Sequence, residues 1–493
     1  MIYPKAFFLW FALLFSSGLL PAQTDTLVLS LEGLVRLAQG EAPDVQIAQT
    51  AFSNDYWRYQ SVLADFKPQI GLAAVLPNLN RTIDAVVLPD GSERFINRSL
   101  MSNFAGLNVG QSIPLTGGRV SASSGLRRLD IFETPGVPSS VSYLFSPIQL
   151  ELVQPLFRFN PLKWSRDLAP IAYEEAQKRY SENVEEVAFQ AARLFFDLLI
   201  AQLNLEAARR DKANADTLYA ISQGRFEVGR IAETELLQIE LNVMTAEGDL
   251  AANELNLQTS TEQLRNFLGI RQAVQFSLLP PSDIPAIAID VDQALDYARR
   301  HRSQVVALQR RLLEAQRDTE QARQESGLNI DLSLAFGLQR DAASLNNVYR
   351  DFLDNERLLL ALNIPIADWG KNRARIEQAR ANEALTLLLT EQERIGFERE
   401  IIVKVQQLEL VRRQVQLAER AYEVAQKRLG ITRERYRIGT ILVTDLNLAI
   451  REEAEARRSY ISALRGFWLA YYELRLLTLF DFEKGVPLVR QER

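Results

Sequence analysis

The sequence contains no cysteine and only one histidine, His301, among its 493 residues. The lack of cysteine excludes disulfide bonds, thiol nucleophiles and thiolate metal sites together. One histidine is too few for most zinc sites and for most general-base arrangements. Because His301 follows Arg299 and Arg300 in a polar predicted helix, we expect it to face solvent. The sequence therefore predicts no catalytic residue, no cofactor-binding residue and no metal ligand.

The chain also lacks an excess of positive charge and a long apolar helix. Its 56 lysine and arginine residues stand against 62 acidic residues, a net charge of −6, so no basic surface invites nucleic acid. After residue 22, no uncharged apolar stretch reaches the ~20 residues that a helical membrane span requires. If the mature chain crosses a membrane, we expect it to do so as a closed β-barrel.

The first 22 residues have the pattern of a secretory signal peptide. Lys5 supplies the positive charge, an apolar core extends from Ala6 to Leu20, and Pro21-Ala22 completes a small-residue cleavage site. No cysteine follows the apolar core, which excludes a lipoprotein anchor. We therefore predict export and cleavage before Gln23.

The chain contains two halves with the same plan. Residues 221–236 and 431–446 share six of sixteen positions at an offset of 210, and residues 34–49 resemble 294–309 at an offset of 260. An ungapped register of this kind indicates a duplicated rigid unit. The two offsets differ by 50, so the first half carries about 50 extra residues, which fall within 70–153. A glycine turn at 113–118 indicates a hairpin there, which would either add strands to the sheet or project as an external loop; we favour added strands.

These patterns divide the chain into five parts. We predict a signal peptide over 1–22, a first repeat over 23–276, a Pro-rich linker over 277–290, a second repeat over 291–480 and a polar C-terminal tail over 481–493. Each repeat begins with a helix. In the first repeat, strands over 70–156 precede a helical hairpin over 163–269. In the second, strands over 330–366 precede a hairpin over 371–480.

Long helices are predicted where proline is absent, over 171–279 and 366–486. Glycines cluster near Gly229 and Gly439, so each stretch is predicted to be a hairpin whose arms have about 55–60 residues, roughly 80–90 Å. Helices of this length must bury an apolar stripe against partners. Two heptad series predict coiled-coil-like seams: Val403, Leu410, Leu417 and Val424, and Ile401, Leu408 and Val415.

Between the helical blocks the apolar residues alternate with small or polar ones. The alternating series are Ile330 to Leu338, Leu358 to Ile366 and Ile148 to Leu152. Strands of this kind suit a transmembrane barrel, although a half-buried sheet in a soluble domain would give the same pattern. A few strands per chain cannot close a barrel alone, because open edges in lipid leave backbone groups unpaired. We therefore expect an oligomer around a central axis, of unspecified copy number.

Several motifs resemble those of the TolC-like outer membrane efflux family. They are Gln154-Pro155-Leu156-Phe157 before the first long helix, Ile364 to Arg373 before its counterpart, and Arg435 to Thr440 followed by Thr444-Asp445-Leu446. The resemblance covers about residues 28–480. It implies a mainly α fold with a membrane β-barrel, in which long antiparallel helical hairpins form an α-barrel and a few strands per chain complete a trimeric outer-membrane barrel.

The resemblance also implies a function and partners. The chain would be one subunit of a homotrimeric outer-membrane channel, an exit duct for efflux or secretion with a long periplasmic extension, and not an enzyme. Its helix turns would contact a periplasmic adaptor protein linked to an inner-membrane pump, which chooses the cargo. The residues matching the adaptor-contacting turns are Arg225, Val228, Gly229, Arg230, Arg435, Ile438, Gly439 and Thr440. A structural turn without a partner would also account for them.

Glu235 and Asp445 lie at equivalent places just past the two turns. In the family, an acidic ring near this point narrows the pore mouth, and Tyr436 matches an aromatic residue of the latch that closes it. Acidic residues in the first turn of a helix are equally expected from the helix dipole alone. Leu448 and Ile441 depart from the family's pattern, which puts its closing mechanism in doubt here.

Two other functions compete with the channel. A periplasmic adaptor also uses helical hairpins, but it would need a compact β-rich domain of the biotinyl or lipoyl type between them, and the sequence offers no such segment. A structural coiled-coil envelope protein would not need the alternating strands or the two-fold repeat.

Overall fold

The computed structural model describes residues 26–87, 90–134, 138–272, 274–281, 284–438, 440–441 and 443–489. The predicted signal peptide, Gly439 and the side chain of Tyr436 lie outside the described residues. Two compact units make up the chain. One contains residues up to 45, 187–286 and 408–472, and the other contains 46–186, 287–407 and 473 onward.

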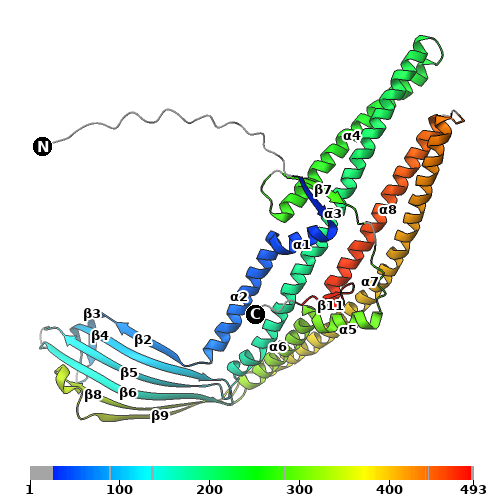
Figure 1. The fold of residues 1–493 in the computed structure, drawn as a ribbon. Coiled ribbons are helices and arrows are strands. Elements are labelled where there is room, and N and C mark those ends of the chain that lie inside the picture. The colour runs from blue at the N-terminus through cyan, green and yellow to red at the C-terminus, as the bar shows by residue number, and fades with distance from the viewer. Residues whose placement is uncertain are drawn as a thin grey trace, which may run out of the picture. The chain divides into compact units, whose positions relative to one another are not determined.

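In the described residues the helices occur as four pairs, one member in each half of the chain, and Figure 1 labels them. Two pairs have the offset of 260 at both ends: α1 (Leu31–Glu41) with α5 (Val291–His301), and α2 (Pro43–Asp65) with α6 (Ser303–Glu325). The other two have the offset of 210: α3 (Pro161–Glu227) with α7 (Lys371–Arg437), and α4 (Glu233–Leu268) with α8 (Val443–Thr478). The two offsets read from the sequence thus recur at every helix boundary.

The arms of the two long hairpins are unequal, so the expectation of two arms of nearly the same length is wrong. The first arms, α3 and α7, have 67 residues each, and the second arms, α4 and α8, have 36 each. The first helix starts at Pro161, close to the predicted hairpin start at 163, and it extends upstream of the proline-free stretch with Pro170 inside it. The second ends at Leu268 because Gly269 adopts a left-handed C-cap with φ of 71°, which only glycine adopts easily.

The larger sheet has seven strands in the order β2-β4-β5-β6-β8-β9, with β3 also pairing with β4. All of its pairings are antiparallel. The strands are β2 (Gln69–Val75), β3 (Leu79–Val87), β4 (Glu93–Ile113), β5 (Gly118–Ile131), β6 (Ser140–Leu156), β8 (Asn329–Ala342) and β9 (Leu353–Asn363), and a 3-10 turn, η1 (Leu345–Asn347), lies between the last two. Because β2 and β3 pair with successive parts of β4, they form one column, and the sheet is six columns wide.

The last strand ends earlier than predicted. Ile364 and Ile366 were expected to continue the alternating strand, but β9 ends at Asn363. Proline has no N–H to donate to a ladder, so Pro365 does not extend the pairing. Trp369 then adopts a positive φ of 54°, which turns the chain toward α7.

Two small sheets were not predicted. Strand β1 (Thr26–Ser30) pairs in parallel with β7 (Gln275–Leu279), which occupies the start of the predicted linker. Strands β10 (Phe480–Asp481) and β11 (Val486–Pro487) form a short antiparallel pair where a polar tail was expected. That expectation is wrong for these residues, because Asp481 is only 2% exposed and forms an ion pair with Arg475 at 3.3 Å.

The core of the first unit joins helices from both repeats. Its fully buried side chains come from α1, α3, α4, α7 and α8 and include Leu34, Phe195, Phe196, Leu198, Leu264, Leu408, Leu464, Phe467 and Tyr471. Asp197 of α3 accepts a hydrogen bond from Arg465 of α8 at 2.9 Å. Apolar burial therefore binds the two hairpins within one chain.

The second unit combines apolar burial with partly buried ion pairs. Arg475 lies between Glu185 at 3.0 Å and Asp481 at 3.3 Å, and all three side chains are nearly inaccessible. Glu182 accepts hydrogen bonds from the backbone N–H and the hydroxyl of Ser303 at 2.6 and 2.7 Å, which caps the N-terminus of α6. A carboxylate is stabilised there by the helix dipole.

Candidate functional site

The seven-stranded sheet has one apolar face. Directly opposed residues of antiparallel strands point to the same side, so the register assigns each side chain to a face. One row across the six columns consists of Ile70, Val109, Ala122, Leu150, Phe336 and Glu356. Only the last, on the outermost strand, is charged. The large apolar members are 39–76% exposed, so this face is uncovered within the chain.

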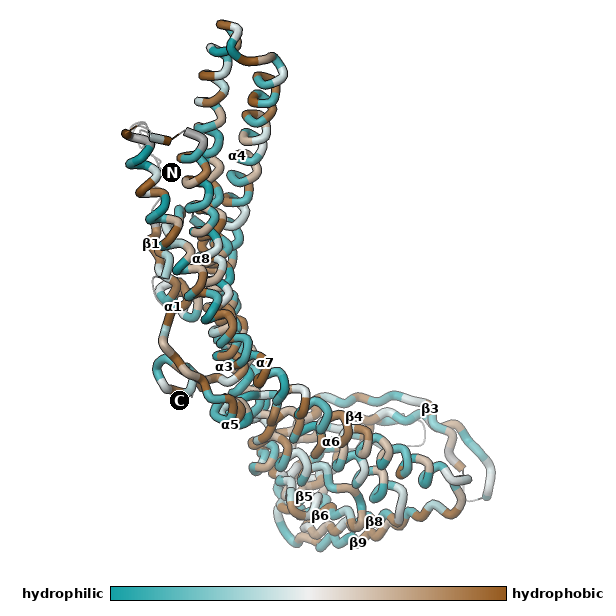
Figure 2. The backbone as a smooth tube through the Cα atoms, turned by 90° about the vertical axis from the view of Figure 1, so that its right-hand side faces the viewer, coloured by the Kyte–Doolittle hydropathy of each residue, from teal (hydrophilic) through white to brown (hydrophobic). Residues whose placement is uncertain are grey.

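The opposite face is polar. The adjacent row consists of Gly71, Asn108, Ser123, Gln149, Gly337 and Asn355, none of which is apolar and large. On the same face, Arg357 and Glu151 form an ion pair at 3.8 Å. Figure 2 shows the resulting alternation of hydrophobic and hydrophilic positions along the strands. An apolar face against lipid and a polar face against water is the arrangement of a transmembrane barrel wall.

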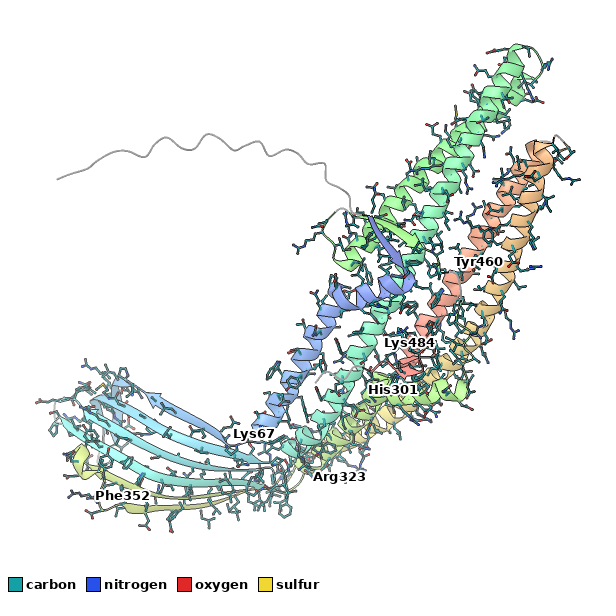
Figure 3. The ribbon with its side chains drawn as sticks, in the orientation of Figure 1. Lys67, His301, Arg323, Phe352, Tyr460 and Lys484 are labelled. Carbon is teal, nitrogen blue, oxygen red and sulfur yellow. The ribbon has the colours of Figure 1, made fainter. Side chains whose placement is uncertain are left out.

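Aromatic side chains lie at both ends of this sheet. Near the connection between β8 and β9, the ring of Phe145 lies 5.0 Å from that of Tyr349 and 6.2 Å from that of Phe352, which Figure 3 labels. At the other end, Phe157 follows β6 and Trp369 follows β9, with 71% and 98% of their surface exposed. Aromatic girdles at both interfaces flank the apolar band of membrane barrels.

The segments that follow β6 and β9 cap the long helices. Asn160 accepts hydrogen bonds from the N–H groups of Leu162 and Lys163 at the start of α3. Asp368 accepts hydrogen bonds from the N–H groups of Asn372 and Gly370 at the start of α7, at 2.9 and 3.0 Å. These bonds, with that from Asn372 the stronger influence, lower the pKa of Asp368. Asn160 and Asp368 thus begin the two long helices, a role that the sequence did not predict for them.

The first helix turn has the geometry that Gly229 predicts, and the second contains an equivalent hydrogen bond. At the first turn, Gly229 has φ of 70°, its N–H donates to Phe226, and the N–H of Arg230 donates to Arg225. This pair of bonds is a Schellman motif. At the second turn, the N–H of Thr440 donates to Arg435 at 2.9 Å, which is the equivalent bond of the second repeat. Val228 and Ile438 are 68% and 69% exposed at the two turns.

The two acidic residues lie where the helix dipole favours them. Glu235 is exposed in the first turn of α4, and Asp445 is exposed in the first turn of α8. They belong to different hairpins (Figure 1), so one chain does not itself assemble a ring from them.

His301 ends α5 and is half-buried (Figure 3), so the expectation that it faces solvent is wrong. Burial, and then the positive charge of Lys178, lower its pKa.

Across the described part of the chain, no group of three or more potential metal ligands is present. In the same residues, no helix is both long and apolar enough to cross a membrane.

Comparison with known proteins identifies the class. The sequence profile of the outer membrane efflux protein family matches residues 138–270 and 294–478. No curated protein matches the sequence. Solved structures with the same fold include a membrane protein from Pseudomonas aeruginosa (17% identity, 94% of this chain and 92% of that chain, TM-score 0.63) and the Campylobacter jejuni CmeC outer membrane channel (16%, 94% and 87%, 0.64). The Neisseria gonorrhoeae MtrE outer membrane channel, in its open state, is also similar (15%, 91% and 88%, 0.58).

The fold is therefore that of an outer-membrane channel with a helical barrel and a β-barrel. The chain belongs to the outer membrane efflux protein family. It is an outer-membrane exit duct for efflux, and the resemblance read from the sequence is confirmed.

We expect Gly229→Ala to destabilise the first turn, because a Cβ at a left-handed φ costs roughly 1–2 kcal/mol. No atom outside the turn would contact that Cβ, so the backbone conformation alone sets the effect. Amide hydrogen exchange over residues 225–236 should accelerate by about fivefold or more. Gly224→Ala, in the interior of α3 with equally open space, is the control and should slow exchange or leave it unchanged. Equal effects of the two substitutions would contradict the assigned turn geometry.

Proposed function

We propose that three copies of this chain close one continuous channel that receives cargo from a periplasmic adaptor and an inner-membrane pump. The observation that carries the proposal is an uncovered apolar series on α7. The two seams expected from the sequence differ: Ile401, Leu408 and Val415 are at most 2% exposed within the chain. The second series continues at seven-residue spacing over five positions that are 53–72% exposed: Val403, Leu410, Leu417, Val424 and Ile431.

A seven-residue apolar series of this length needs a partner helix. Because one seam already packs inside the chain, the exposed seam is available for a neighbouring copy. The sheet also needs a partner. One of its outermost columns consists of β2 and β3 and the other is β9, and among the described strands each column is paired on one side. Cyclic symmetry satisfies both demands at once, with every edge and every seam meeting an identical chain. We take the copy number of three from the resemblance to the outer membrane efflux family.

We further propose that the tips of the hairpins dock the adaptor. Val228 and Ile438 present exposed apolar side chains beside Arg225, Arg230, Arg435 and Thr440. An apolar centre with an arginine rim is a favourable composition for a protein interface. Gly229 and Gly439 complete the matching turns in the sequence.

We also propose that Glu235 and Asp445 form the acidic ring at the pore mouth, with Tyr436 in the latch that closes it. Three copies would bring six carboxylates around the axis. A ring of that charge favours cations over anions. The exposure of both side chains supports the proposal, because carboxylates that face solvent can line a water-filled pore.

The exposed seam is tested by Leu417→Lys. A lysine would place a charge without a partner in the interface of each pair of copies, which costs several kcal/mol. We expect the trimer fraction in native mass spectrometry to fall at least about tenfold. Glu419→Lys should leave the trimer intact, because residues two positions apart lie on different faces of a helix. A stable trimer of the first variant would contradict the proposed seam.

The docking surface is tested by the double substitution Val228→Asp and Ile438→Asp. We expect export of the cognate cargo to fall about tenfold and the adaptor to be lost from pull-downs, while the trimer persists. Asn214→Asp, an exposed change on α3 away from the turn, should affect neither readout. Full export by the double variant would show that these side chains do not contact the adaptor.

The acidic ring is tested by Glu235→Gln combined with Asp445→Asn. Reversal potentials in planar bilayers under a salt gradient should move toward the value of a non-selective pore. Glu233→Gln removes a different carboxylate from the first turn of α4 and should change the potential less. An unchanged potential in the double variant would leave helix stabilisation as the only role of these acids.

A further inference from the structure

The first half of the chain carries an inserted hairpin. In the second half, only β8 and β9 lie between α6 and α7. The starts of β2 and β8 keep the offset of 260, whereas the starts of α3 and α7 have the offset of 210. The surplus of the first half therefore falls between the start of β2 and the start of α3. With β2 and β3 counted as one column that corresponds to β8, the strands without a counterpart in the second half are β4 and β5.

The pairing makes this hairpin part of the sheet rather than an appendage. β4 pairs with β2 over seven positions and with β5 over fourteen, from Ile113–Gly118 to Leu100–Ile131. β5 then pairs with β6 along most of its length. In the part of the chain that the structure describes, β2 reaches β6 only through β4 and β5. Taking the hairpin out of the wall would leave β2 without its partner.

The two faces of the sheet continue across the hairpin. Val109 and Ala122 belong to the apolar row, and Asn108 and Ser123 belong to the polar row. On the polar face, the ring of Phe104 lies so close to Gly106 and Gly125 that a Cβ on either glycine would approach it to 2.8 Å. The hairpin thus lies in the same lipid-to-water orientation as the rest of the wall.

We infer that the hairpin widens the outlet. The closed trimer then has eighteen strand columns, six from each chain, and passes bulky hydrated solutes. This inference rests on the proposed trimer. The two strands per half of the underlying repeat would give twelve. Barrel diameter grows roughly in proportion to strand number, so the outlet is about 1.5-fold wider, in the range where barrels hold an open aqueous channel. Polar residues such as Asn108, Ser121 and Ser123 line part of the inner face of the hairpin.

Single cysteines test the wall directly, because the chain has none of its own. Ser123→Cys and Ala122→Cys probe the two faces of the hairpin. Gln149→Cys and Leu150→Cys lie directly opposite them on β6 and serve as matched controls. The purified protein in lipid vesicles is treated with a charged, membrane-impermeant maleimide. We expect Ser123→Cys and Gln149→Cys to react at least about tenfold faster than Ala122→Cys and Leu150→Cys.

The outcomes separate two kinds of failure. If the hairpin projects as a loop, Ala122→Cys and Ser123→Cys react alike while the β6 pair keeps its difference, and the inference is overturned. If all four cysteines react alike, the sheet is not in lipid and the proposed channel fails as well.

The width itself is tested with maleimide-linked polyethylene glycols of graded mass, added from the cell exterior to Gln149→Cys. The comparison is with the same cysteine in a chain lacking residues 90–137, which joins β3 to β6. We expect the full chain to be labelled by larger polymers than the shortened one. An equal size limit in both would overturn the inference, and if the shortened chain does not fold, the four cysteine variants decide.

Discussion

The pairing of backbone groups in the seven-stranded sheet is the constraint on which the rest of this structure depends. In lipid, a strand edge whose N–H and C=O groups lack partners costs several kcal/mol per group. The sheet is six columns wide and has one uncovered apolar face, so it suits lipid only when its edges are closed. A curved sheet of this width does not close on itself with an open lumen, and identical copies supply the missing partners most simply.

The long helices also have surfaces that require partners. Part of the apolar surface of the 67-residue helix α7 packs within the chain, as the burial of Ile401, Leu408 and Val415 shows. The parallel series that includes Leu410 and Leu417 is exposed within the chain, and we propose that another copy covers it. Helix and sheet therefore require the same symmetry for different reasons, hydrophobic burial in water and hydrogen bonding in lipid. The caps at Asn160 and Asp368 begin each long helix a few residues after a strand of the sheet ends.

Much of this fold could be predicted because the sequence contains two copies of the same structural repeat. The offsets of 210 and 260 located every helix pair, and the alternation from Ile330 to Leu338 marked a strand that the structure contains. Composition could not separate the buried heptad from the exposed one, since both consist of the same residue types. The β1–β7 pair was missed because its strands are short and lie about half the chain apart in sequence. Asp481 was assigned to a tail because its partner, Arg475, becomes apparent only in three dimensions.

Electron cryo-microscopy of the purified full-length protein in lipid nanodiscs tests the closure of the sheet most directly. The account predicts one ring in which every strand at membrane depth is paired on both sides, and in which β2 of one copy lies beside β9 of the next. A particle in which either strand faces lipid unpaired, or a chain that remains single, would contradict it.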